Sequence, residues 1–155
     1  MAELAQTRRV MSGLEYMRKL VAGELEASPM ARLLHIRIVD VEEGKVVVTA
    51  EPTPEFENGL RIAHGGFAAT LLDTALGCAV NSVMPAGKIF TTLEMKIHFT
   101  KAVTRQTGTL TCTASIVHAG SRTATAEGRI VDAAGNVYAH GSATCILFRD
   151  LSEEP

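Results

Sequence analysis

The segment over residues 67–84 constrains this chain more than any other feature of the sequence. Its apolar residues occupy every face of a helix instead of forming one stripe, and a helix of that kind must be surrounded by protein. Asp73 and Asn81 interrupt the segment, and a central Asp argues against insertion into a membrane. We therefore expect a helix at the centre of a globular domain, packed against most of the remaining chain.

After Gly87 the apolar residues recur at every second position, which predicts half-buried strands. In the first of them, Leu93 and Phe99 belong to the apolar set, whereas Thr92 and His98 belong to the polar set that alternates with it. There are four such strands in all, over about 92–99, 109–116, 123–130 and 137–147. Residues 118–121 and 132–136 have the composition of hairpin turns, so we expect an antiparallel sheet.

The chain before the central helix adds one helix and one hairpin. Residues 4–27 carry apolar side chains at helical spacing until Ser28-Pro29 ends the pattern, and 36–41 and 45–51 are β-branched runs around a turn. Because one sheet must cover a helix that is apolar on all sides, the sheet has to curve. The prediction is an α+β fold with a helical extension over 1–29, a single domain over 30–150 and a frayed tail over 151–155.

Size, charge and cysteine content exclude several classes of protein. The 155 residues suffice for one domain, and 15 basic against 17 acidic side chains do not favour a nucleic-acid binder. The three cysteines are isolated and the histidines are scattered, so we expect no metal and no cofactor. The sequence contains no phosphate-binding loop, dinucleotide-binding motif or nucleophile elbow. The N-terminus has no secretory signal, so we expect a cytoplasmic protein without membrane contact.

Asp73 is the first candidate for chemistry. It lies in the middle of the apolar helix, where a lone carboxylate is costly to bury and where Asp is a poor helix former. One interpretation is a structural residue that forms a hydrogen bond with a neighbouring strand or loop. The other is a carboxylate held ready as a nucleophile or general base.

The triplet His64-Gly65-Gly66 comes immediately before this helix. Two glycines leave the first N–H groups of a helix uncovered, and these donors, at the positive end of the helix dipole, can polarise a carbonyl or bind an anion. The simpler interpretation is a pair of glycines that permits a tight turn. For His64 we favour a capping or hydrogen-bonding role over that of a base.

Helix geometry sets a condition on any joint role of Gly65 and Asp73. Eight residues of helix correspond to about 12 Å of axial rise, so one small reacting group cannot contact both within one helix. If the two act together, Asp73 has to come from a second subunit whose helix runs alongside and antiparallel. A two-fold dimer would contain two such sites.

Three further segments are less specific. Asn58, six residues before His64, suits a turn as well as a hydrogen bond to a ligand. Thr91 and Thr92 begin a strand and could orient a water molecule through a hydroxyl group. The Gly-Ser-Arg segment at 120–122 could hold a phosphate through backbone N–H groups and a guanidinium, or simply form a hairpin turn.

Taken together, these residues resemble a known family. Asn58, the HGG triplet at 64–66, Asp73 in a long apolar helix and the strand from Thr92 resemble the PaaI-like acyl-CoA thioesterases of the hotdog-fold superfamily. The resemblance covers about residues 33–148. It implies a long antiparallel sheet wrapped around a central helix, in agreement with the order of elements above.

The resemblance also implies catalytic roles. Asp73 would be the nucleophile or the base that activates water, and the Gly65 N–H would polarise the thioester carbonyl. Asn58 and His64 would hold the thioester and shape the turn before the helix. The hydroxyl that orients water would belong to Thr92, and whether Thr92 or its neighbour Thr91 acts stays open.

Binding roles follow in the same way. The resemblance implies substrate contacts at Gly66 and Thr91 beside the reacting group, and contacts with the CoA portion at Gly120, Ser121 and Arg122. Family members form dimers whose sites lie across the interface, and dimers often pair into tetramers. We therefore expect a homodimer or homotetramer with shared active sites.

The leading hypothesis is hydrolysis of an acyl-CoA thioester to a free acid and CoA, in which CoA is part of the substrate. A second hypothesis keeps the fold but makes the protein an acyl-thioester hydratase or dehydratase, with His64 and Asp73 as acid and base. A third is a non-catalytic acyl-CoA-binding module. The acyl group, the choice between covalent and general-base catalysis, and the role of the N-terminal helix stay open.

Overall fold

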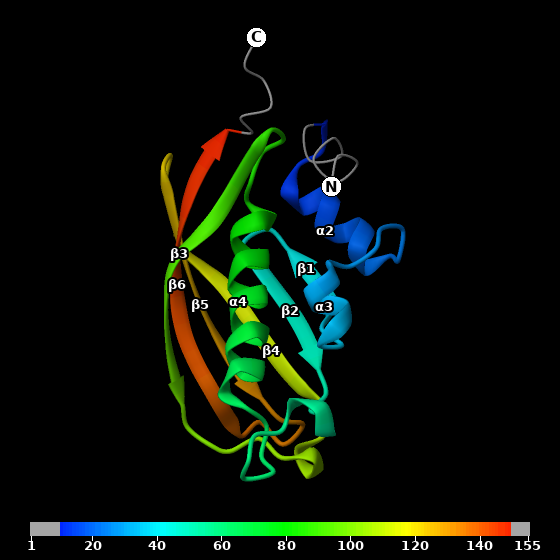
Figure 1. Cartoon of the computed structure of the whole chain (residues 1–155). Coiled ribbons are helices and arrows are strands. Elements are labelled where there is room, and N and C mark those ends of the chain that lie inside the picture. The colour runs from blue at the N-terminus through cyan, green and yellow to red at the C-terminus, as the bar shows by residue number, and fades with distance from the viewer. Residues whose placement is uncertain (1–9, 150–155) are drawn as a thin grey trace.

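Six strands form a single antiparallel sheet in the computed structural model, which describes residues 10–149. The strand order is β1-β2-β4-β5-β6-β3, and the long helix α4 lies across one face of the sheet (Figure 1). The strands are β1 (Arg37–Glu42), β2 (Lys45–Ala50), β3 (Lys88–Phe99), β4 (Leu110–Ala119), β5 (Thr123–Val131) and β6 (Val137–Arg149). The predicted α+β architecture, a long antiparallel sheet with a central helix, is confirmed.

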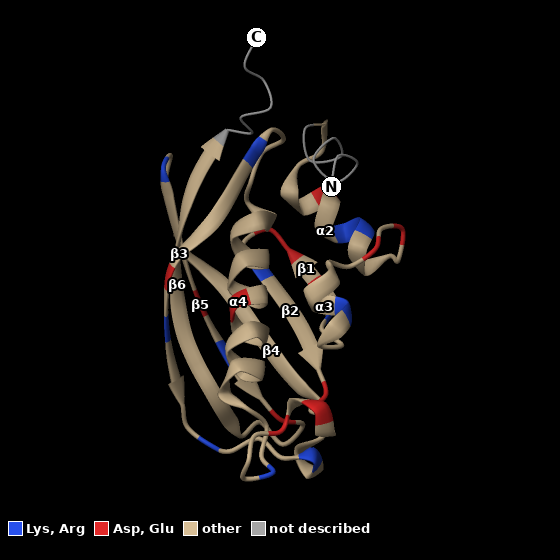
Figure 2. Ribbon diagram, viewed as in Figure 1, with Lys and Arg blue, Asp and Glu red and all other residues tan. Residues whose placement is uncertain are grey.

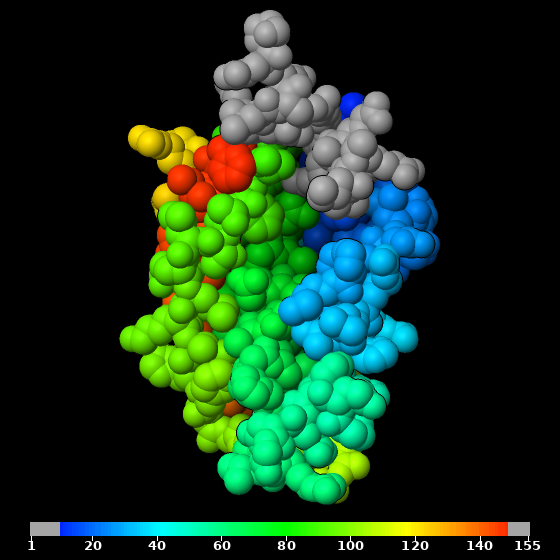
Figure 3. All heavy atoms as spheres, in the orientation of Figure 1, coloured from blue at the N-terminus to red at the C-terminus, as the bar shows by residue number. Residues whose placement is uncertain are grey.

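The apolar segment forms α4 (Gly65–Ser82), close to the predicted range. Its sheet side is fully buried, with Leu71, Leu72 and Leu76 inaccessible to solvent. The opposite side is not covered by the sheet, and Figure 3 shows atoms of α4 at the floor of a groove between β3 and the N-terminal helices. Asp73 lies on this open side and is exposed, so the expected burial of its carboxylate is wrong for the single chain.

Strand β3 departs from its predicted alternation. A bulge between Thr92 and Glu94 leaves Leu93 without a partner on β6. Because a bulge inserts one residue, the alternation of the strand changes phase at that point. Thr92 therefore faces α4 on the same side of the sheet as Met95, while Leu93 is 58% exposed.

The two edges of the sheet are β1 and β3. Strand β3 pairs only with β6, so the other side of this 12-residue strand has no strand partner among the described residues. Leu93 and Phe99 are large, apolar and more than half exposed on it. A long edge strand with these properties is suited to pairing with another chain.

Within the described residues, the N-terminal extension contains two separate short helices, α2 and α3, where one continuous helix was predicted over 4–27. Helix α2 (Gly13–Val21) begins at a capping box in which Ser12 and Glu15 bond reciprocally. Helix α3 (Pro29–Leu33) begins at the Ser28-Pro29 pair, which was expected only to end a helix. The Ser28 hydroxyl accepts the Ala31 N–H at 3.3 Å and so caps the start of α3. Residues 1–9 and the tail over 151–155 lie outside the described part of the chain.

Short connections complete the fold. The turn predicted over 118–121 lies at 120–122, because β4 extends to Ala119, and the turn predicted over 132–136 joins β5 to β6 as expected. Single 3₁₀ turns, η1 (Pro54–Phe56) and η2 (Arg105–Thr107), flank the loops at the N-terminal end of α4. Within residues 10–149, no helix combines the length and the apolar character needed to cross a membrane.

Candidate active site

Asp73 and Thr92 form the first half of the candidate site. The Thr92 hydroxyl donates a hydrogen bond to Asp73 Oδ1 at 3.1 Å. This is the contact with a neighbouring strand expected for a structural Asp, and it also joins the carboxylate to the hydroxyl expected to orient water. Asp73 is the one charged residue of α4, which is otherwise free of acidic and basic colour in Figure 2. Thr91 is exposed, so Thr92 is the threonine placed beside Asp73.

Two thiols lie beside this pair. Burial raises the pKa of the Cys78 thiol to about 12, and the negative charge of Asp73 adds to the effect. Cys145 Sγ lies 4.0 Å from the Thr92 hydroxyl, and burial raises its pKa as well. Because only thiolates are strong nucleophiles, both cysteines remain protonated and unreactive near neutral pH.

A cavity of about 510 Å³ opens beside Asp73 and Thr92. Helix α4, helix α2, strand β1 and strand β3 all contribute to its walls. The sequence left the position of the N-terminal helix open, and the structure places α2 directly against this half of the site. The sequence indicates which side of α2 packs inward. Met17 is followed three and four residues later by Leu20 and Val21, and this spacing gives α2 one apolar face.

The N-terminus of α4 forms the second half. His64 is the N-cap residue, and its Nδ1 accepts the Gly66 N–H at 2.8 Å. The next donor, the Phe67 N–H, bonds the His64 carbonyl at 2.9 Å. The Gly65 N–H has no hydrogen-bond partner among the residues that the structure describes. The expected capping role of His64 is therefore confirmed, and Gly65, not Gly66, carries the free donor.

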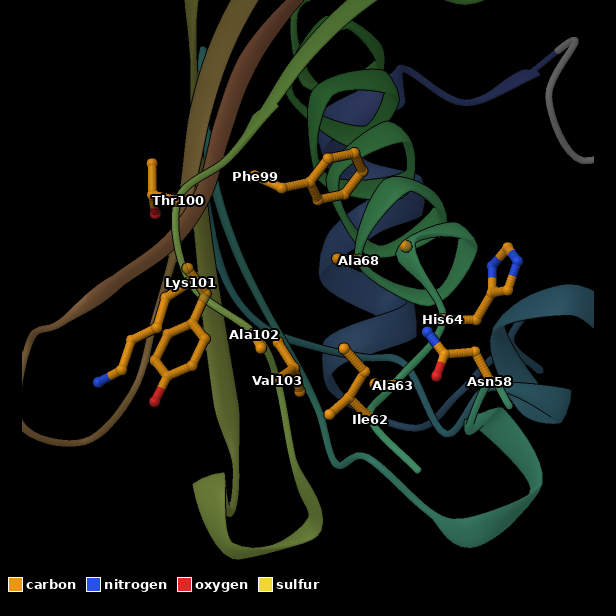
Figure 4. A pocket seen from close by; sticks show the side chains of 12 residues that line it. Asn58, Ile62, Ala63, His64, Ala68, Phe99, Thr100, Lys101, Ala102 and Val103 are labelled. Carbon is orange, nitrogen blue, oxygen red and sulfur yellow. The ribbon is translucent and has the colours of Figure 1, made fainter. Parts of the chain in front are cut away.

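A second cavity, of about 330 Å³, opens at this free N–H. Figure 4 shows Phe99 reaching toward the first turns of α4 from β3, with Asn58 and His64 on the other wall. A Cβ at Gly65 would lie 3.3 Å from the Phe99 ring, so glycine lets the ring approach the helix terminus closely. Asn58 Oδ1 accepts the Leu60 N–H at 2.8 Å, which fixes the amide in a tight turn at the cavity rim.

Within one chain the two halves stay apart. Gly65 and Asp73 are eight residues apart on one continuous helix, about 12 Å along its axis, and no residue lines both cavities. The structure therefore brings Asp73 together with Thr92, and Gly65 together with Asn58 and His64, but does not join the two groups.

The predicted CoA contacts lie in a third place. Gly120, Ser121 and Arg122 form the turn between β4 and β5, where the Arg122 carbonyl accepts the Leu147 N–H at 2.8 Å. Leu147 pairs with the start of β3, so this turn lies toward Thr92 and far from the Phe99 end of the strand. Ser121 and Arg122 are exposed. Within residues 10–149, no group of three or more His, Cys, Asp or Glu side chains is arranged to hold a metal ion.

Comparison with known proteins identifies the family. A family model described as "Thioesterase superfamily" matches residues 60–139, which include the N-terminus of α4 and Asp73. The Escherichia coli acyl-coenzyme A thioesterase PaaI is 34% identical over 107 residues, which are 69% of this chain and 74% of that protein. A 1,4-dihydroxy-2-naphthoyl-CoA hydrolase from Listeria monocytogenes is 33% identical over 98 residues, 63% of this chain and 77% of that protein.

A solved structure agrees with these sequence matches. The structure of the Escherichia coli PaaI protein superimposes with a TM-score of 0.77 at 28% identity, and the match covers 88% of this chain and 96% of that one. The matched region includes nearly the whole of both chains, so the likeness extends beyond the segment that the family model recognises. The chain therefore belongs to the thioesterase superfamily, as a PaaI-like member with the hotdog fold.

Proposed function

We propose that this thioesterase hydrolyses an acyl-CoA thioester at a site that two copies of the chain share. The observation that carries the proposal is the separation of the two halves. The free Gly65 N–H and the Asp73–Thr92 pair lie on the same helix, about 12 Å apart, and open into different cavities. The Asp73–Thr92 half lacks a donor for an oxyanion, and the Gly65 half lacks a carboxylate.

The edge strand β3 supports a specific way of joining them. Thr92, beside Asp73, lies near the start of the strand, and Phe99, over Gly65, ends it. If two copies pair through β3 in antiparallel fashion, the Phe99 end of one strand lies against the Thr92 end of the other. Gly65 of one copy then lies on the side of Asp73 of the partner subunit.

The chemistry follows from this arrangement. The Gly65 N–H donates to the thioester carbonyl oxygen and stabilises the negative charge that develops on it. Asp73 of the partner subunit attacks the carbonyl carbon, or takes a proton from a water molecule that does so, and the Thr92 hydroxyl holds the carboxylate in place. The C–S bond breaks and the CoA sulfur takes up a proton. When water attacks, the acyl group leaves directly as a free acid; when Asp73 attacks, a water molecule then hydrolyses the acyl–Asp73 anhydride, which releases the free acid and restores the carboxylate.

The relatives support acyl-CoA as the substrate class, since the two relatives described above are named for reactions on acyl-CoA thioesters. For the CoA portion, the exposed Arg122 offers a guanidinium that can pair with a phosphate, and the Ser121 N–H lies in the same turn, whereas the Gly120 N–H already donates to the Thr123 carbonyl at 2.8 Å. This contact is part of the proposal.

The first experiment measures free thiol release from a panel of aliphatic and aromatic acyl-CoAs. We expect the wild-type protein to release CoA and Asp73→Asn to lose about 10²–10⁴-fold in kcat, the usual contribution of a positioned base. Asp40→Asn is the matched control, because Asp40 is an exposed carboxylate on β1 that lines neither cavity, and the activity of this variant should equal that of the wild type. Wild-type turnover by Asp73→Asn would refute the assignment.

A second experiment tests whether the site is shared. Gly65→Pro removes the free N–H at a helix position that tolerates proline, and Asp73→Asn removes the carboxylate. If the two inactive variants are co-expressed and mix at random, half of the dimers are mixed and each mixed dimer has one complete site, so activity should return to about a quarter of the wild type. No recovery in verified mixed dimers would place both groups in one chain.

The same panel decides against the other two functions. A hydratase or dehydratase would change an enoyl or hydroxyacyl thioester without releasing CoA. A binding module would bind acyl-CoA tightly with no turnover and would tolerate Asp73→Asn.

A further inference from the structure

The cavity beside Asp73 extends along α4 in one direction only. The residues of α4 that line it begin at Asp73 and end at Asn81. Eight residues of helix give it a length of about 12 Å, directed away from Gly65 and toward the C-terminus of α4. A thioester whose carbonyl lies at Asp73 therefore has space for its acyl group in the part of the cavity between Asp73 and Asn81.

Helix α2 forms the wall opposite α4. Tyr16, Met17, Leu20 and Val21 lie on one face of α2 and line the cavity, and Leu25 follows after the helix ends. Ile36, just before β1, Ile38 of β1 and Phe90 of β3 complete an apolar enclosure. The charged side chains in the lining are Asp73 and Arg37, and α2 contributes none. These walls suit an uncharged acyl group.

This wall is held firmly in place. The Gly13 N–H donates to the Met84 carbonyl at 2.8 Å, which ties the start of α2 to the end of α4. Met17 is 1% exposed and belongs to the hydrophobic core. The capping box of Ser12 and Glu15 fixes the first turn of the helix. The extension is therefore a built part of the cavity.

We propose that α2 is the outer wall of the acyl-binding pocket and that Leu20, which lines the cavity together with Gly77 and Cys78 of α4, limits the size of the acyl group. The inference rests on the function proposed above and adds the substrate class to it. An extended carbon chain advances about 1.25 Å per bond, from bonds of about 1.5 Å at tetrahedral angles, so 12 Å accommodates about ten carbons. The pocket is thus suited to an uncharged, medium-chain acyl group.

The test compares two leucines of α2. Leu14 and Leu20 both pack against the core and are partly buried, but only Leu20 lines the cavity. The variants Leu20→Ala and Leu14→Ala remove the same atoms from the same helix, so Leu14→Ala controls for the loss of stability. For each full-length protein, kcat/KM is measured by thiol release over straight-chain acyl-CoAs from two to sixteen carbons.

Leu20→Ala should favour larger substrates. Each buried methylene contributes about fourfold, so a chain two carbons longer than the wild-type optimum should improve about 15-fold relative to that optimum. Leu14→Ala should keep the wild-type profile. Gly77→Ala adds a methyl group to the opposite wall, 3.4 Å from the Phe90 ring, which is an ordinary contact, and should shift the profile toward shorter chains.

The outcomes separate the inference from the function on which it rests. If the wild type releases CoA but Leu20→Ala and Gly77→Ala keep its chain-length profile, or if Leu14→Ala shifts it equally, the acyl pocket lies elsewhere and the inference is wrong. If no acyl-CoA of any length is hydrolysed by the wild type, the proposed function itself fails. Gly77→Ala keeps the test valid even if Leu20→Ala does not fold.

Discussion

Gly13 offers a direct test of how tightly the N-terminal helix is docked. A Cβ added at this position would lie 1.6 Å from the Asn81 carbonyl oxygen and 2.6 Å from its carbonyl carbon. Both atoms belong to the backbone of α4, so they cannot rotate away. Gly13→Ala therefore has to push α2 outward by about 2 Å to reach an ordinary contact distance.

The cost of this displacement follows from the contacts that it breaks. The hydrogen bond from the Gly13 N–H to the Met84 carbonyl contributes about 1 kcal/mol, and its loss is the smaller part. Met17, now 1% exposed, loses much of its burial, which costs about 1–3 kcal/mol for a side chain of this size. We expect the free energy of unfolding to fall by about 2–4 kcal/mol in total.

Denaturant unfolding at a fixed protein concentration measures this change, and the thiol release assay on the same samples shows whether the acyl-chain profile broadens. Gly59→Ala is the control, since no atom lies within 4 Å of a Cβ at that glycine and the change should stay within about 0.5 kcal/mol. A Gly13→Ala protein as stable as the wild type would show that α2 does not pack on Asn81 as described.

Two further predictions concern ionisable groups. The side chain and N–H of Asn136, with further donors, hold the pKa of Asp132 below its usual value. Its ionised form therefore stabilises the β5–β6 turn above the pKa of the unfolded chain, and this contribution is lost as pH falls through the lowered pKa. Thermal unfolding from pH 7 to pH 2.5 should show Asp132→Asn less stable than wild type at neutral pH, with a difference that narrows as the pH falls, and a constant difference would contradict the assignment. With a pKa of about 12, Cys78 should react with iodoacetamide at pH 8 on the order of a thousandfold more slowly than a free thiol. If peptide mapping finds Cys78 alkylated within minutes, its pKa is not raised.

The central helix and the turns could be predicted because their signals are local. The apolar run after His64 predicts α4 by itself, and the two glycines that follow His64 predict an uncovered helix N-terminus. The structure adds that His64 occupies the Gly66 N–H, which leaves Gly65 as the free donor. Helix pitch alone predicted that Gly65 and Asp73 stay apart within one chain, and the two separate cavities agree with it.

Other features depend on contacts between distant residues and have no local signal. Gly13 looks like a weak position in a helix, yet it is the point where α2 approaches the backbone of Asn81. The alternation of β3 assigns Thr92 to the polar set, and only the bulge at Leu93 turns its hydroxyl to Asp73. The bulge arises from pairing with β6, which lies about 50 residues later in the sequence.

The strand order links assembly to chemistry. After α4 the chain enters the sheet at its edge as β3, and pairs with β6 instead of its sequence neighbour β4. This one strand therefore carries Thr92 beside Asp73 and Phe99 over Gly65. The same strand is an edge of the sheet, with one side unpaired among the described residues. Under the proposed pairing of two β3 strands, the same residues that hold each half of the site also set the position of the partner subunit. Catalysis and dimer formation then depend on one register, and a shift of that register by even two residues, about 7 Å, would separate the carboxylate from the oxyanion donor.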